Sequence, residues 1–168
     1  MHEDIPIPGS AKARLIAAGI LQFSQHGYEG VDVDSVAAEA GVTTGSLYHH
    51  FQSKKRFYGV LRDDMTRRVL DRMEAVAEAV APERTVKAAL LAAYDGALRI
   101  KAGRLLTEPD PRGGDDAIAG LLGELAAKSG MVVPDMVGIV LAAGLRAALS
   151  QALEEHAEAR QALELLLG

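Results

Sequence analysis

Hydroxyl, aromatic and basic side chains crowd into one short stretch of the chain, TTGSLYHHFQSKKR at residues 43–56. Side chains of these kinds donate hydrogen bonds to phosphate oxygens and to the edges of bases. Lys54, Lys55 and Arg56 follow Ser53, which can begin a helix as its N-cap. Cations in the first turn of a helix are unfavourable by about 0.3–1 kcal/mol each, and a bound anion reverses the sign. The stretch therefore predicts a phosphate-binding surface. The alternative is that the long basic side chains simply extend into water.

Two short helices must hold these side chains in place. Asp32 or Asp34 can cap the first, and the second runs from about Thr44 to His50. Gly41 between them can adopt the positive φ of a tight turn, and the small side chain of Ala37 allows a close crossing. This spacing is typical of a helix-turn-helix. It points Val36, Ala40, Val42 and Leu47 inward, and Thr44, Gly45, Tyr48 and His49 outward.

Other chemistry at these residues is disfavoured. His49 and His50 are adjacent, so on a helix they point about 100° apart, and we expect no metal site. The sequence holds no cysteine nucleophile, no HExxH pair and no glycine-rich phosphate loop after a strand. The acids of 108–116 are expected to lie in a loop without a basic partner. We therefore expect no enzyme activity and no cofactor.

The motifs of residues 11–58 resemble the N-terminal DNA-binding domain of the TetR family of transcriptional regulators. They are Gly27-Tyr28, Val36-Ala37, Gly41-Val42-Thr43, Gly45-Ser46-Leu47-Tyr48, His50-Phe51 and Ser53-Lys54. The resemblance implies that Thr44 and His49 read bases, that Thr43, Tyr48, His50 and Lys54 contact the DNA backbone, and that Phe23, Val36, Leu47 and Phe51 form a small core. With the neighbouring Gly45 and Lys55, the predicted DNA-binding set is Thr43, Thr44, Gly45, Tyr48, His49, His50, Lys54 and Lys55.

Two residues depart from the family pattern. Val31 and Asp32 stand where the family usually has Thr or Ser. Asp32 can cap a helix, but its carboxylate repels a phosphate. A helical interaction or ligand-carrier protein that keeps the helix-turn-helix only as a scaffold is therefore the alternative function.

Composition indicates an all-α fold of two unlike parts. Alanine and leucine dominate and tryptophan is absent, which favours helices throughout the 168 residues. Residues 1–68 carry 8 Lys and Arg against 8 Asp and Glu, whereas residues 69–168 carry 10 against 15. Six of the seven Phe and Tyr residues precede residue 59. We predict a flexible tail at 1–9, a helix-turn-helix domain at 10–58 and a larger helical regulatory and dimerisation domain at 59–168, with separate cores.

Helical periodicity and breakers place the remaining elements. Helices are predicted from Ser10 to about Gln25, from Ser53 to about Val80, over 83–103 and 116–128, and from Pro134 to about Leu153. Residues 105–116 hold two prolines and two glycines, so they are predicted to be a mobile loop. Whether 134–168 is one helix or two stays open.

The larger domain is expected to dimerise and to bind a ligand. The resemblance implies that its last two helices pair with those of a second subunit; the alternative is that their apolar face packs only within one subunit. The predicted dimer interface is Val137, Leu141, Gly144, Leu145, Ala148, Leu149, Leu163 and Leu166. The predicted pocket is Met73, Leu90, Tyr94, Leu98 and Met131, with Arg99 for an anionic ligand.

Together these features predict a ligand-responsive transcriptional regulator. The chain is expected to be a repressor that binds a near-palindromic DNA operator as a homodimer and is released by an unknown small-molecule effector. No apolar run approaches the roughly 18 residues that a membrane span needs, and the N-terminus lacks the pattern of a signal peptide. We therefore expect a soluble, cytoplasmic protein without a membrane partner.

Overall fold

The computed structural model describes residues 9–151 and 155–167, and within these ranges the regular structure is helical and no strand occurs. This confirms the all-α prediction. The predicted tail falls almost entirely on residues 1–8, and the predicted helix end near Leu153 falls on 152–154; both lie outside the described residues. The helices are α1 (Ala11–Gly30), α2 (Val33–Glu39), α3 (Thr44–Phe51), α4 (Lys54–Glu78), α5 (Thr85–Arg99), α6 (Gly103–Thr107), α7 (Ala117–Lys128), α8 (Pro134–Gln151) and α9 (His156–Leu165), with a 3-10 turn at Pro82–Arg84.

Side-chain caps fix where the first four helices begin. The side-chain oxygens of Ser10, Asp32, Thr43 and Ser53 accept hydrogen bonds from backbone N–H groups two or three residues ahead. Each bond satisfies one of the N–H groups that a helix start leaves without an internal partner. The cap predicted at Ser53 is confirmed, and Asp32 rather than Asp34 caps α2.

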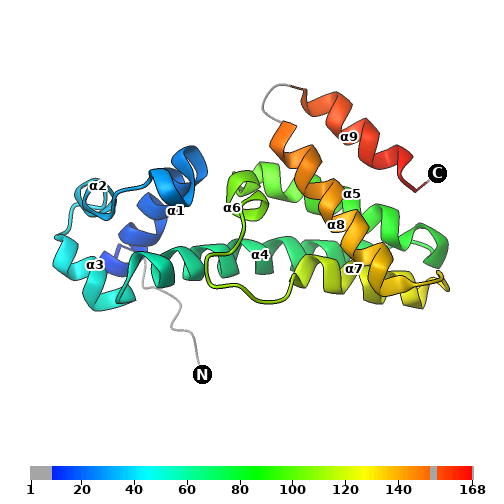
Figure 1. Cartoon of the computed structure of the whole chain (residues 1–168), viewed down its shortest axis with the longest axis horizontal. Coiled ribbons are helices and arrows are strands. Elements are labelled where there is room, and N and C mark those ends of the chain that lie inside the picture. The colour runs from blue at the N-terminus through cyan, green and yellow to red at the C-terminus, as the bar shows by residue number, and fades with distance from the viewer. Residues whose placement is uncertain (1–8, 152–154, 168) are drawn as a thin grey trace.

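Helix α4 joins the two parts of the molecule. Helices α1 to α3 gather around its N-terminal end, and α5, α6 and α7 pack against it farther along (Figure 1). The rings of Phe23 and Tyr58 meet edge to face at 5.0 Å, and both side chains are fully buried. From Phe57 and Tyr58 the buried residues continue through Leu61 into the larger domain as one cluster. The predicted separate cores are therefore wrong, because α4 contributes side chains to both parts.

Gly19 allows α1 to cross α4 closely. A Cβ added at Gly19 would lie 2.7 Å from Leu61 Cδ1 and would also overlap the Phe57 ring. A glycine inside a helix costs roughly 0.5–1 kcal/mol relative to alanine. The close contact with two buried side chains explains why the chain has a glycine here.

The segment predicted as a mobile loop is partly helical and is held by ion pairs. Residues 103–107 form α6, which buries Leu105 and Leu106. Beyond it, Arg112 forms salt bridges with Asp63 of α4 and with Asp110. The prediction is therefore corrected at 105–107, and the rest of the loop is fastened along α4. Among the described residues, no helix has the length and apolar character to cross a membrane.

The chain after Pro134 forms two helices. Helices α8 and α9 are separate elements that pack against each other, and α9 folds back beside α8 (Figure 1). The buried faces of both helices join the same core cluster as α5 and α7. This settles the question of one helix or two that the sequence left open.

Candidate functional site

The predicted DNA-contacting side chains lie on α3, on its N-cap or in the first turn of α4. None of them is buried: Thr44 and Lys54 are half-buried, and the other six are exposed. The Tyr48 side chain, for example, is 44% exposed although it is large and aromatic. The structure therefore brings these residues together on an accessible surface, which we call the α3 face: Thr43, Thr44, Gly45, Tyr48, His49, His50, Lys54 and Lys55.

The opposite side of α3 anchors it in the core. Leu47 is fully buried and Phe51 is 4% exposed, with the rings of Phe51 and Phe57 4.5 Å apart. Gly41 has a φ of 65°, as the predicted turn requires. Gln52, a residue to which the sequence assigned no role, ends α3 with a φ of 66°. These contacts fix the direction in which the α3 face points.

Neighbouring side chains hold the cations at the start of α4. The Lys54 Nζ lies 4.8 Å from the centroid of the Tyr28 ring, a cation–π contact supplied by α1. Arg56 donates a hydrogen bond to the side chain of Gln52. Lys55 is exposed. Two of the three cations are thus held near the N–H groups of the helix end, where an anion is favoured.

The two threonines before Gly45 are already engaged. Thr43 Oγ1 accepts the Ser46 N–H at 3.2 Å, as expected of an N-cap. Thr44 Oγ1 donates to the Asp34 carboxylate of α2 at 2.6 Å. The sequence indicated no partner for Thr44, because Asp34 and Thr44 are ten residues apart and only the packing of α2 on α3 joins them.

Helix α6 fastens the C-terminal end of α1 to the larger domain. Glu108 Oε2 accepts the Tyr28 N–H at 2.8 Å, and Arg104 donates to the Gln25 carbonyl. Gly27 has a φ of 71°, and a Cβ there would overlap the Glu108 carboxylate. We call Arg104 and Glu108 the latch. Sequence analysis missed it, since its partners are about 80 residues away along the chain.

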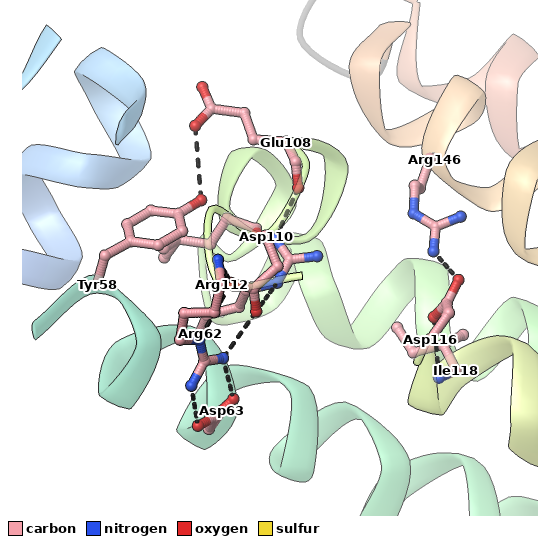
Figure 2. A network of polar contacts seen from close by, with 10 residues as sticks. Tyr58, Arg62, Asp63, Glu108, Asp110, Arg112, Asp116, Ile118 and Arg146 are labelled. Atoms are coloured by element: carbon pink, nitrogen blue, oxygen red, sulfur yellow. Dashed lines mark hydrogen bonds and ion pairs between the residues drawn. The ribbon is translucent and has the colours of Figure 1, made fainter. Parts of the chain in front are cut away.

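A second set of ion pairs fastens the loop after α6 to α4. Figure 2 shows Arg62, Asp63, Asp110 and Arg112 converging beside Glu108. The hydrogen bonds from Arg112 hold the pKa of Asp110 below its usual range. Burial, and then the nearby Glu108 carboxylate, raises the pKa of Tyr58, whose hydroxyl is 3.5 Å from Glu108 Oε2. The charged Asp110 and the neutral Tyr58 are therefore both favoured at neutral pH.

A cavity of about 470 Å³ lies beneath this loop. Asp116, the N-cap of α7, forms a salt bridge with Arg146 of α8 at one side of it (Figure 2). Burial lowers the pKa of Arg146. The loop acids thus have basic partners, contrary to the expectation from sequence. The lining combines charged with apolar side chains, among them Arg62, Asp63, Leu106, Pro109, Ile118 and Arg146.

The predicted ligand pocket is corrected by the structure. Met73, Leu90 and Tyr94 are each 0% exposed and belong to the continuous core. The Tyr94 hydroxyl is hydrogen-bonded to the Nδ1 and the carbonyl oxygen of His156. Arg99 is exposed, whereas Leu98 and Met131 are half-buried and pack on the core. None of these six residues lines the cavity beneath the loop. Met73, Leu90 and Tyr94, which were predicted to contact a ligand, fill the protein interior instead.

The predicted dimer interface is only partly accessible, because most of its residues are buried within a single subunit. Leu141, Leu145, Ala148, Leu149 and Leu163 are at most 9% exposed within a single subunit. Val137 and Gly144 are half-buried, and Gly144 faces Leu166, which is itself 52% exposed. The apolar side chains that α8 does expose are different ones. We call them the outer α8 face: Met136, Ile139, Val140, Ala143 and Ala147.

Removing the latch carboxylate is expected to loosen the end of α1. Glu108→Ala deprives the Tyr28 N–H of its partner, and a charged hydrogen bond of this kind is worth about 1 kcal/mol when partly exposed. We expect faster hydrogen exchange at the Tyr28 amide and a free energy of unfolding lower by about that amount. Urea unfolding and NMR exchange measure the two. Glu124→Ala, an exposed glutamate on α7, is the control; equal effects of both variants would contradict the latch.

Comparison with known proteins supports the resemblance. Residues 15–59 match the family model described as bacterial regulatory proteins, tetR family. That segment covers most of α1, the helix-turn-helix and the start of α4, so it includes the whole α3 face.

Curated relatives match over the same region. The chain is 40% identical over 47 residues to IcaR of Staphylococcus aureus (strain Newman), a negative transcriptional regulator of the biofilm operon icaADBC; this covers 28% of the chain and 25% of IcaR. It is 38% identical over 65 residues to the transcriptional repressor KstR2 of Mycolicibacterium smegmatis, covering 38% of the chain and 32% of KstR2. The chain thus matches between a quarter and a third of the length of these relatives.

Solved structures match over almost the whole chain. A structure described as the molecular basis for control of antibiotic production by bacterial hormones aligns with a TM-score of 0.72 at 25% identity, covering 93% of this chain and 94% of the other. A putative tetR family transcription regulator from Shewanella sp. PV-4 aligns with a TM-score of 0.74 at 20% identity, covering 94% and 96%. The helix-turn-helix region, residues 15–59, therefore belongs to the TetR family of transcriptional regulators, and almost the whole chain shares the fold of a solved TetR-family structure.

Proposed function

We propose that the chain binds duplex DNA with α3 in the major groove and the N-terminus of α4 on the phosphate backbone. The observation that carries this proposal is the start of α4, where the side chains of Lys54 and Arg56, in the first turn of the helix, contact Tyr28 and Gln52. Such an arrangement gains most from a bound phosphate. The adjacent α3 face presents hydrogen-bonding side chains to base edges. We propose accordingly that the protein acts in the cytoplasm.

A homodimer is the form proposed to bind DNA. The outer α8 face exposes Met136, Ile139 and Val140, each more than half exposed. Positions 136, 140, 143 and 147 follow helical spacing, so they form one apolar stripe that a second copy can cover. Two α3 faces related by a twofold axis would meet successive major grooves about 34 Å apart, which requires a near-palindromic operator.

Repression with release by an effector is the proposed mode of regulation. IcaR is a negative regulator and KstR2 is a repressor, which favours repression over activation for this chain. We propose that a small polar effector occupies the cavity beneath the loop, since its wall includes Glu108 of the latch as well as Arg62 of α4. A ligand that prefers one arrangement of the latch also shifts α1 and the start of α4. Release of the protein from DNA then follows because the effector binds one arrangement of the latch more tightly than the other.

Selection of bound genomic fragments tests the proposed function. The full chain at low ionic strength is mixed with sheared genomic DNA, and bound fragments are recovered and sequenced. We expect enrichment of a near-palindromic sequence with half-sites one helical turn apart. Recovery of no duplex above background would contradict DNA binding and favour a scaffold role for the helix-turn-helix.

Single substitutions on the α3 face separate phosphate contacts from base contacts. Lys54→Ala is expected to weaken binding to all duplexes alike and to flatten the salt dependence by about one unit, because one phosphate contact is lost. His49→Ala is expected to relax preference at one base pair per half-site. Fluorescence anisotropy over a salt series measures both. Lys128→Ala, an exposed lysine at the end of α7, is the charge control; if it matches Lys54→Ala, the contact assignment fails.

A further inference from the structure

The hydroxyl of Thr44 already has a hydrogen-bond partner within the protein. Thr44 begins α3, and its Oγ1 donates to Asp34 Oδ1 at 2.6 Å. This length is typical of a hydroxyl donating to an ionised carboxylate, which is among the stronger hydrogen bonds in proteins. A threonine hydroxyl has only one proton. That proton is therefore unavailable for donation to a base.

The same bond orients the rest of the Thr44 side chain. The hydroxyl and the methyl of threonine share one Cβ, so fixing the direction of Oγ1 also fixes the direction of Cγ2. Thr44 is only half-buried. Gly45 beside it has no side chain, and a Cβ placed there would meet only Thr43 Oγ1, at 3.7 Å. Thr44 therefore retains the Cγ2 methyl and the acceptor lone pairs of Oγ1 for contact with DNA, and the methyl is its one apolar group.

We infer that Asp34 makes Thr44 a methyl reader, which recognises the 5-methyl group of thymine by apolar contact. The inference rests on the proposed insertion of α3 into the major groove. Thymine is the base that presents a methyl group there, and a threonine methyl is one of its usual partners. A free threonine hydroxyl can instead bond to several bases. Asp34 is therefore a positioning residue that narrows the choice of base.

The carboxylate of Asp34 also has an opposing effect on affinity. It is exposed on α2, the helix next to the α3 face, and a negative charge near DNA phosphates is repulsive. Asp34 thus lowers affinity for every duplex while it fixes the orientation of Thr44. Selectivity is the difference between the affinities for competing sequences. A repulsive element such as this charge is one way to obtain it.

Deoxyuridine tests the inference directly, because it pairs like thymine but lacks the methyl group. Starting from a duplex that the protein binds, each thymine is replaced in turn and affinity is measured by anisotropy. At one thymine per half-site we expect wild-type affinity to fall about fourfold, the effect of losing one buried carbon group. Thermal unfolding verifies that every variant used is folded.

Two near-isosteric variants of Thr44 identify the group that reads the base. Thr44→Val loses the hydroxyl and its bond to Asp34 but carries a methyl at both γ positions on a stiff β-branched side chain, so a methyl stays in the Cγ2 position and the deoxyuridine effect should remain. Thr44→Ser keeps the hydroxyl and its bond to Asp34 but loses the methyl, so it should bind thymine and deoxyuridine equally. The reverse order would show that the hydroxyl oxygen reads the base and would overturn the inference.

Variants of Asp34 test its positioning role. Asp34→Asn removes the charge and keeps an oxygen acceptor, so affinity for all duplexes should rise while the deoxyuridine effect remains. Asp34→Ala should raise affinity similarly but reduce the deoxyuridine effect by half or more, because Thr44 can then rotate. If no duplex is bound at all, the proposed function fails. If a duplex is bound but no thymine methyl matters, or if the alanine variant keeps the full effect, only this inference is overturned.

Discussion

Ala143→Asp is expected to convert the proposed dimer into a monomer and to lower affinity for the proposed operator by at least about 100-fold. Ala143 is exposed on the outer α8 face, in line with Met136, Val140 and Ala147. Dimerisation would bury this position against the second copy. An unpaired carboxylate buried in an apolar interface costs several kcal/mol, which exceeds what a small interface can compensate. A monomer then offers only one α3 face to a two-half-site operator.

Sedimentation velocity and anisotropy measure the two effects of Ala143→Asp. Ala75→Asp makes the same chemical change at an exposed position of α4, and it should leave both mass and affinity unchanged. Dimers of Ala143→Asp at micromolar concentration would show that the outer α8 face is not the interface. Loss of dimers in both variants would point to a general effect of the added charge.

Gly138→Ala is expected to have the largest effect on stability, lowering the free energy of unfolding by about 3 kcal/mol or more. Gly138 lies where α8 crosses α7, and a Cβ there would be 2.6 Å from the Gly123 amide nitrogen and would overlap the Ala119 carbonyl oxygen. Both obstacles are backbone atoms, so the two helices must move apart as rigid elements. A domain is typically stable by only about 5–15 kcal/mol, so this loss is a large part of the total.

Gly120→Ala is the matched control for Gly138→Ala. Gly120 is exposed on α7, and a Cβ there would meet no other atom within 4 Å. The substitution should therefore stabilise the protein by roughly 0.5–1 kcal/mol through better helix propensity. Urea unfolding followed by circular dichroism measures both variants. A Gly138→Ala protein as stable as wild type would mean that the α7–α8 crossing is looser than the structure shows.

The candidate DNA-binding site was predictable from sequence because it is local. The α3 face spans residues 43–55, and the caps Thr43 and Ser53 act on N–H groups only three residues away. Helical spacing then separates the buried Leu47 and Phe51 from the exposed Tyr48 and His49. The all-α class and most helix starts follow from the same short-range rules. One continuous stretch of sequence therefore predicts both the fold of this region and its proposed role in DNA binding.

The proposed dimer face was not predictable because α8 is apolar around most of its circumference. Met136, Ile139 and Val140 are as hydrophobic as Leu141 and Leu145, yet the first three are exposed and the last two are buried. The packing of α8 on α7 decides which side faces the core, and that packing depends on glycines whose role appears only in three dimensions. The prediction of the ligand-pocket residues differs from the structure for a related reason. A methionine or tyrosine in the core and one that lines a pocket have the same local sequence pattern.

The sequence by itself determined most of the helices, the caps of the first four and the α3 face, since each depends on residues within a few turns of one another. Only the tertiary structure decided how those parts are connected. Glu108 meets Tyr28 across 80 residues and Arg112 meets Asp63 across 49, so neither pair leaves a periodic signal in the chain. The hydrogen bond between Asp34 and Thr44 likewise depends on how α2 packs against α3. Contacts between elements require the final packing, because side-chain direction is fixed only when the helices are docked.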